Sequence, residues 1–197
     1  NLANLTDAEM RYLRRDLQLI FQDPYSSLNP RMTVGQIIGE GLMAHNIFKK
    51  GDPKMQDYIM EIMEKCGLAS YFIHRYPHQF SGGQRQKVYL AMALAQDTPV
   101  LLLDEPTTFL DIAHQLELAE TARTLAGEGK AVVMVLHDLN LALSCAHRVA
   151  VLEEGQLRRV GAPEEIYASG VLEKVFQVRV HSVETAKGER QYLFSRL

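Results

Sequence analysis

An uninterrupted apolar run at residues 100–103 is the clearest pattern in the sequence, because it leads directly into two adjacent carboxylates, Asp104 and Glu105. A run of this kind is typical of a strand that is buried on both faces in the middle of a parallel sheet. Pro106 cannot donate a hydrogen bond to a neighbouring strand, so we expect the strand to stop there. The two carboxylates would then lie at the carboxyl end of the strand, where open α/β sheets bind their ligands.

Two further apolar runs predict strands of the same sheet. Residues 17–21 end at Gln22, where an Asp-Pro pair breaks the strand, and residues 131–136 form a second buried strand that ends at His137. A glutamine in such a place is usually a loop residue, and a histidine is usually a hydrogen-bonded structural residue. Both become candidate site residues because the carboxyl ends of parallel strands meet at one edge of the sheet.

A short helix at residues 6–15 is predicted before the first strand, and the pattern between the first two strands is helical. Helix-capping residues begin the predicted helices at residues 33–44 and 52–66. The last of these carries an apolar stripe, which predicts core packing rather than a cofactor site: Met55, Ile59, Ile62, Met63 and Cys66. We therefore expect a helical insert that behaves as a subdomain.

After the Asp-Glu strand, helices and strands alternate again. Asp111 is the predicted cap of a helix at residues 112–126, and Glu154-Gly155 is the predicted turn of a hairpin. The remaining expected elements are a helix at residues 139–146, the hairpin strands at residues 148–152 and 156–160, a short helix from Pro163, and strands at residues 175–180 and 191–194.

Ser81-Gly82-Gly83-Gln84 begins a predicted helix that runs to Ala95, with Ser81 as its cap. Two glycines at the start of a helix cost up to about 1 kcal/mol each relative to alanine. They are explained if a ligand must approach the backbone closely. A helix N-terminus with free N–H groups, a serine hydroxyl and no Cβ in the way suits an anion. The alternative is a flexible Gly-Gly hinge.

The Asp104-Glu105 pair has its own chemistry. Two adjacent carboxylates repel each other and are costly to bury without a cation. One carboxylate can hold Mg²⁺ while the other holds a water molecule. The alternative is a strand that ends in two solvated acids.

Composition narrows the function classes. The 197 residues carry a net charge of −3 with the basic residues spread along the chain, which argues against nucleic acid as a partner. The two cysteines have no metal-ligand spacing, and no apolar run approaches the roughly 20 residues of a membrane span.

Together these motifs resemble those of the ATP-binding cassette (ABC) ATPases. Ser81-Gly82-Gly83-Gln84 is identical to the signature motif of that family, and the apolar run ending in Asp104-Glu105 is similar to its Walker B strand. Leu110-Asp111 resembles the D-loop, His137 the switch histidine and Gln22 the Q-loop glutamine. The resemblance implies an α/β, P-loop NTPase core with an inserted α-helical subdomain. Residues 1–22 would end the first part of the core at the Q-loop, residues 23–96 would form the subdomain, and residues 97–197 would complete the core.

The resemblance also implies roles for these residues. Asp104 would hold Mg²⁺, which Gln22 would also reach, and Glu105 would be the general base for the attacking water. His137 would contact the γ-phosphate. Residues 81–84 and Asp111 would belong to an ATP site that is completed by the opposite subunit of a dimer.

One family motif does not occur: the sequence contains no G-x-x-x-x-G-K-[ST] phosphate loop. The expectation is an N-terminally truncated ATPase that is inactive alone and active as the full-length protein. The alternative is a truncated or degenerate non-catalytic module that lends its signature motif to the ATP site of a partner subunit.

The front and rear parts of the sequence resemble importers of different solutes. Residues 21–33 and 75–83 resemble oligopeptide, dipeptide and nickel importers, whereas residues 103–112, 135–140 and 161–165 resemble iron-siderophore, haem and cobalamin importers. The expected protein is the ATP-binding subunit of an ABC importer that lies at the cytoplasmic face of the cell membrane. Its partners would be membrane permease subunits and a second ATPase subunit, in a homo- or heterodimer.

Overall fold

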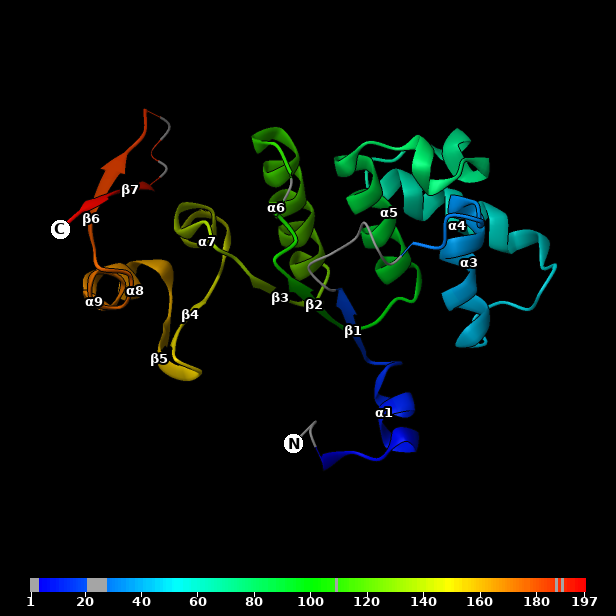
Figure 1. The fold of residues 1–197 in the computed structure, drawn as a ribbon, viewed down its shortest axis with the longest axis horizontal. Coiled ribbons are helices and arrows are strands. Elements are labelled where there is room, and N and C mark those ends of the chain that lie inside the picture. Colours follow the sequence, from blue (N-terminus) through cyan, green and yellow to red (C-terminus); the bar gives the residue numbers. More distant parts are fainter. Residues whose placement is uncertain (1–3, 21–27, 109, 187, 189) are drawn as a thin grey trace. The chain divides into compact units, whose positions relative to one another are not determined.

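The computed structural model describes residues 4–20, 28–108, 110–186, 188 and 190–197. The chain folds as two compact units, Asn1–Val135 and Leu136–Leu197, and each is described here by itself (Figure 1). No helix within the described residues combines the length and the apolar character that a membrane crossing needs. The predicted division into core and subdomain segments at residues 22 and 96 stays a prediction.

The first unit is built on a three-stranded parallel sheet in the order β1-β2-β3. The strands are β1 (Leu17–Ile20), β2 (Val100–Asp104) and β3 (Ala131–Val135). Leu19 pairs with Leu102, and Leu102 pairs with Val133. The strand that leads into the two carboxylates is thus the central one, as the sequence predicted.

The helices of the first unit begin where the capping residues predicted. Thr6 and Thr33 each form a capping box, and Asp52 accepts a hydrogen bond from the N–H of Lys54 just before Pro53. The helices are α1 (Asp7–Leu13), α3 (Val34–Ala44), α4 (Pro53–Lys65), α5 (Gly82–Ala95) and α6 (Ile112–Gly127), with the short 3₁₀ turns η2 (Ser70–His74) and η3 (Pro77–Gln79).

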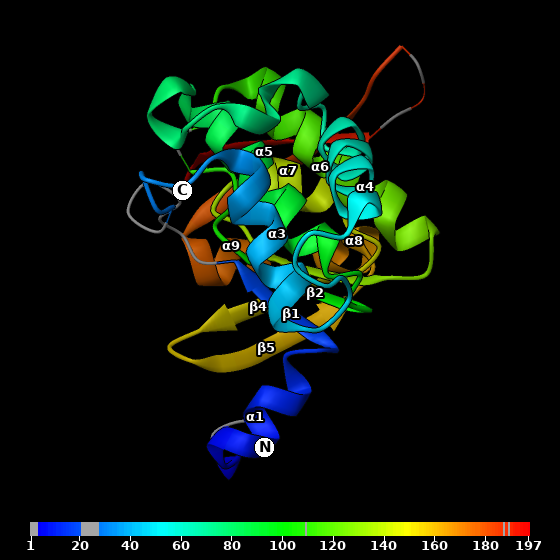
Figure 2. The same ribbon diagram turned by 90° about the vertical axis from the view of Figure 1, so that its right-hand side faces the viewer.

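Helix α5 lies at the centre of the apolar core of this unit. Helices α3 and α4 pack against it, and so does β1 (Figures 1 and 2). Val88 and Ala91 of α5 and Met63 of α4 are completely buried in one hydrophobic cluster. The methionine-rich stripe of α4 is therefore core packing, as predicted.

The predicted burial of β3 on both faces is wrong. Val132 and Met134 pack against the core, but the side chains of Val133 and Val135 are 53% and 52% exposed. Within the described residues, packing against the hydrophobic cluster occurs on the face that carries Ile20, Leu101 and Leu103, and Val133 and Val135 lie on the opposite face. An apolar run shows that a strand can be buried on both faces, but it does not supply the neighbours that cover them.

The second unit contains two antiparallel hairpins and three short helices. The elements are α7 (Leu139–Cys145), β4 (Val149–Glu153), β5 (Gln156–Gly161), α8 (Pro163–Ala168), α9 (Val171–Phe176), β6 (Val178–Glu184) and β7 (Arg190–Arg196). Glu154 and Gly155 both have positive φ angles and form the predicted hairpin turn.

One prediction in the second unit fails: a strand from Val175 was expected, but Val175 and Phe176 end helix α9. Gly170 and Gln177 adopt left-handed conformations at the two ends of this helix. The side chain of Leu172 is buried in the small core of the unit. This tertiary packing outweighs the local strand preference of the valines.

Candidate functional site

Asp104 ends strand β2, and Glu105 follows it in an unusual backbone conformation. The φ angle of Glu105 is 46°, in the left-handed region that residues with a Cβ rarely adopt. Such a conformation persists only where the surroundings hold it, and it is concentrated at functional sites. Both carboxylates are half-buried.

Three hydrogen bonds hold Glu105, the residue after the strand, in place. The N–H of Glu105 donates to the carbonyl oxygen of Val135 at 3.1 Å, so the main chain stays attached to β3. The N–H of Thr108 donates to the carbonyl oxygen of Glu105 at 3.2 Å, and the Thr108 hydroxyl donates to Glu105 Oε2 at 3.3 Å. The carboxylate therefore projects from the sheet edge in a fixed turn.

Asp111 caps helix α6, as predicted. Its Oδ1 accepts the backbone N–H of His114 at 2.9 Å and lies 2.7 Å from Nδ1 of the His114 ring. The hydrogen bond from the His114 backbone and then that from its ring lower the pKa of Asp111 below its ordinary value. The side chain is exposed, so the carboxylate can still reach a group outside this unit.

The predicted helix start with Ser81 as its cap is present at α5. Ser81 Oγ accepts the N–H of Gln84 at 3.3 Å, and Gln84 Oε1 accepts the N–H of Ser81 at 3.1 Å. The first N–H groups of a helix have no acceptor within the helix, and Gly82 and Gly83 leave them without a Cβ beside them. The capping box thus fixes the loop while the backbone donors stay available to an anion.

Helices α5 and α6 are joined at two points near this start. A Cβ placed on Gly83 would lie only 2.9 Å from Cδ2 of His114. One turn further along, Lys87 Nζ is 2.7 Å from Oε2 of Glu117. The sequence did not predict these two contacts between the helices. It does carry a signal for the bond between His114 and Asp111, because a side chain three residues after a helix cap can bond to that cap.

The roles of two predicted site residues, His137 and Gln22, stay predictions. His137 is exposed and belongs to the second unit, directly before Asp138, the cap of α7. Its approach to Glu105 stays a prediction. Gln22 lies outside the described residues, so its role is also untested.

The donor set fits a magnesium ion held together with phosphate. No group of three or more His, Cys, Asp or Glu side chains that could bind a metal occurs in the described part of the chain. Mg²⁺ bound with substrate phosphates needs only one or two carboxylates from the protein. Asp104, half-buried at the strand end, supplies one.

Comparison with known proteins shows the family and the fold of the chain. Residues 1–108 match the ABC transporter family, and the chain belongs to that family. It is also similar to the ATP-binding cassette MJ0796, whose dimer was solved in a post-hydrolysis state bound to ADP and Pi, with a TM-score of 0.71 and 29% identity over 81% of this chain and 68% of that one. The fold is that of an ABC ATPase.

Two curated relatives are peptide transport proteins of Bacillus subtilis. The oligopeptide transport ATP-binding protein OppF is 41% identical over 78% of this chain and 50% of its own length. The dipeptide transport ATP-binding protein DppD is 34% identical over 93% of this chain and 58% of its own length. The chain thus spans about half the length of these relatives.

Proposed function

We propose that this chain is part of the ATP-binding subunit of an ABC importer, which couples ATP binding and hydrolysis to solute uptake. The observation that carries the proposal is the Asp104-Glu105 pair at the end of the central strand. Glu105 is held there in a left-handed conformation by its hydrogen bond to Val135. In an ABC family member, a rigid acid at this strand end is suited to catalysis.

Each of the candidate site residues has a distinct role in this proposal. Glu105 accepts a proton from the attacking water, a role typically worth about 10²–10⁴-fold in rate. Asp104 holds Mg²⁺, which neutralises phosphate charge when it is bound. His137 contacts the γ-phosphate, and Gln22 reaches the metal ion.

The start of α5 is assigned to a second nucleotide. Ser81, Gly82, Gly83 and Gln84 present backbone donors and a hydroxyl to the phosphates of an ATP held mainly by the opposite subunit, and Asp111 lies at the same contact. The existence of a dimeric cassette among the similar structures supports this arrangement. The subunits are identical or homologous.

The partners proposed are membrane permease subunits and a second ATPase subunit, at the cytoplasmic face of the cell membrane, without nucleic acid. The names of the relatives favour small peptides as the transported solute. The iron-siderophore, haem and cobalamin class is the alternative, on the motifs of residues 103–112 and 135–140.

The competing proposal is that the chain acts as a non-catalytic module, and one feature of the sequence favours it. The 197 residues contain no phosphate loop motif, while the signature helix is intact. We expect this chain alone to bind ATP weakly and to be inactive in hydrolysis. It would then act by lending Ser81–Gln84 to a site on another polypeptide.

Two measurements test the proposal. The full-length gene product should hydrolyse ATP, and affinity purification from detergent-solubilised membranes should recover permease subunits with it. Recovery of ribosomes or DNA in place of permeases would contradict the importer assignment. Micromolar ATP binding by the 197-residue chain alone would contradict its expected dependence on a further phosphate loop.

A further inference from the structure

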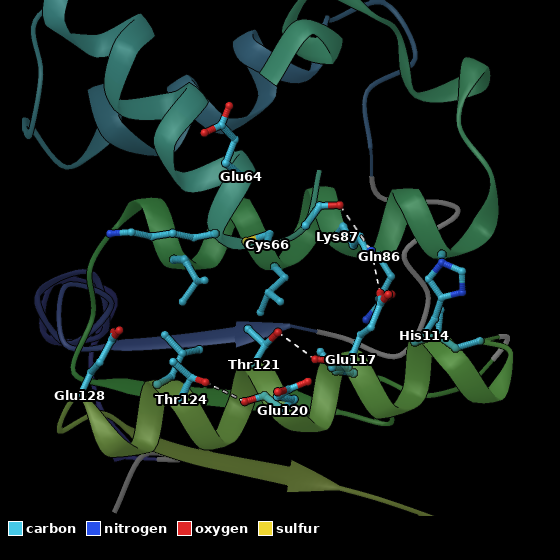
Figure 3. Close-up of a pocket in the computed structure, with 18 residues that line it drawn as sticks. Glu64, Cys66, Gln86, Lys87, His114, Glu117, Glu120, Thr121, Thr124 and Glu128 are labelled. Carbon is cyan, nitrogen blue, oxygen red and sulfur yellow. Dashed lines mark hydrogen bonds and ion pairs between the residues drawn. The ribbon is translucent and has the colours of Figure 1, made fainter. Parts of the chain in front are cut away.

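A cavity of about 510 Å³ lies between α5 and α6 in the first unit, with the end of α4 at its edge (Figure 3). Four buried leucines give it an apolar floor, two from each long helix: Leu90, Leu94, Leu118 and Leu125. Small-molecule sites commonly have volumes of about 300–1,000 Å³ and a mainly apolar lining. The cavity is therefore of a size to hold a small organic molecule.

A buried amide lines this apolar cavity. Gln86 of α5 is only 8% exposed and forms part of the lining. Its side-chain amide therefore stands at the wall of an apolar hollow. An amide at a cavity wall that has no partner within the protein can hydrogen-bond to a molecule in the cavity.

The rim of the cavity is acidic. Both lysines that line it are already paired: Lys87 with Glu117 at 2.7 Å, and Lys65 with Glu61 at 3.0 Å. The other rim carboxylates, which have no ion pair in the described part of the chain, are Glu64, Glu120 and Glu128 (Figure 3). A low-dielectric hollow with unpaired carboxylates at its mouth attracts cations.

We propose that this cavity binds a small amphiphilic cation, a protonated amine that carries an apolar chain or ring. The apolar part lies on the four leucines. The ammonium group donates to the amide oxygen of Gln86 and to the carboxylates of the rim. This site is separate from the proposed ATP chemistry, although Gly83 and His114 at one end of the cavity join it to the start of the signature helix.

A small molecule suits the hollow better than a helix of a partner protein does. The Lys87–Glu117 ion pair joins α5 to α6, and Lys87 Nζ also donates to the carbonyl oxygen of Gly67 at 3.4 Å. These contacts cross the space between the helices. An inserted helix, which is about 10 Å wide, would have to break them.

The first test is isothermal titration calorimetry of n-octylammonium binding to the 197-residue chain at neutral pH and low salt. Two controls have the same chain length: octan-1-ol is uncharged, and octanoate carries the opposite charge. We expect a millimolar or tighter dissociation constant for n-octylammonium, weaker binding of octan-1-ol and no binding of octanoate. Equal affinity for the three probes, or no binding of n-octylammonium, would overturn the proposal.

Variants locate the site. Glu120→Gln and Glu128→Gln should each weaken n-octylammonium binding about two- to fivefold, because each removes one partly solvated attraction. Glu40→Gln, on the exposed surface of α3 and outside the cavity, is the charge-matched control and should leave the affinity unchanged. Thr121→Phe fills the cavity and should abolish binding.

Gln86→Leu tests the buried amide. It should weaken n-octylammonium binding while leaving octan-1-ol binding unchanged, because only the charged probe needs the hydrogen bond. If this variant does not fold, the Glu120 and Glu128 variants still decide the question. Unchanged affinity in Thr121→Phe, or in a double variant that carries both Glu120→Gln and Glu128→Gln, would mean that the probe binds elsewhere and would refute the site.

Discussion

The imidazole of His114 occupies the place that a side chain on Gly83 would need. The atoms Cδ2, Nε2 and Cγ of the ring would lie 2.9, 3.0 and 3.1 Å from a Cβ at that position. The same ring is bonded to the cap of α6 through Asp111. The second glycine of the signature motif thus has a structural reason within this unit, besides the close approach of an anion.

Gly83→Ala should therefore destabilise the protein. Alanine is favoured over glycine in a helix by up to about 1 kcal/mol, but overpacking against a fixed ring costs about 1–3 kcal/mol. We expect a net loss of about 1 kcal/mol in the free energy of unfolding, measured with urea.

His114→Ala in the Gly83→Ala background should recover the loss, so the two substitutions should be strongly non-additive. Gly127→Ala is the matched control, because a Cβ there meets nothing within 4 Å, and it should be neutral or stabilising. Additive effects of the Gly83 and His114 substitutions would show that the ring is not what excludes a side chain.

The Asp111 cap should make stability depend on pH. Its hydrogen bonds to the backbone and ring of His114 lower the pKa of the folded state, so the carboxylate stabilises the fold above its unfolded pKa of about 3.9. This contribution is lost as the pH falls through the lower, folded pKa.

Asp111→Asn keeps a good capping residue but removes the charge. The wild-type chain should be more stable than this variant at pH 7, and the difference in urea midpoint should shrink towards pH 3. Asp57→Asn, on the exposed surface of α4, serves as the control for removal of one carboxylate. A difference that stays constant from pH 7 to pH 3 would contradict the charge-dependent cap.

Cys66 should be a poor nucleophile in the folded protein. Burial raises the pKa of its thiol to about 12, with partial relief from the nearby charge of Lys87. In a Cys145→Ala background, iodoacetamide at pH 8 should modify Cys66 at least about a hundredfold more slowly in the native state than in urea.

The native rate of Cys66 modification should keep rising with pH above pH 9, because the thiolate fraction is still increasing there. A rate that levels off near pH 9 would indicate an ordinary, accessible thiol. Because the thiolate forms more readily in the unfolded chain than in the fold, we also expect the free energy of unfolding to fall as the pH rises above about 8.5.

Local sequence signals predicted much of the fold because they act over a few residues. The capping box at Thr33 and Gln36 defines the start of α3, and the apolar run before Asp104 identifies the central strand. The exposed valines of β3 and the helix at Val171–Phe176 were not predictable in this way. Both depend on which distant residues cover an apolar surface.

The candidate site was predictable only in part for the same reason. The strand end at Asp104 and the helix start at Ser81 are visible as local motifs. The contact between Gly83 and His114, and the burial of Gln86 at a cavity wall, arise from the packing of α5 on α6. No spacing in the sequence shows which face of one helix meets the other.

The central claim is that Glu105 is the catalytic base of an ABC ATPase. The most direct test is the ATPase rate of the full-length gene product and of its Glu105→Gln variant, with Glu154→Gln at the hairpin turn as the control. We expect normal ATP binding but a fall of about 10²–10⁴-fold in hydrolysis for Glu105→Gln and no change for the control. An unchanged rate in Glu105→Gln would contradict the account.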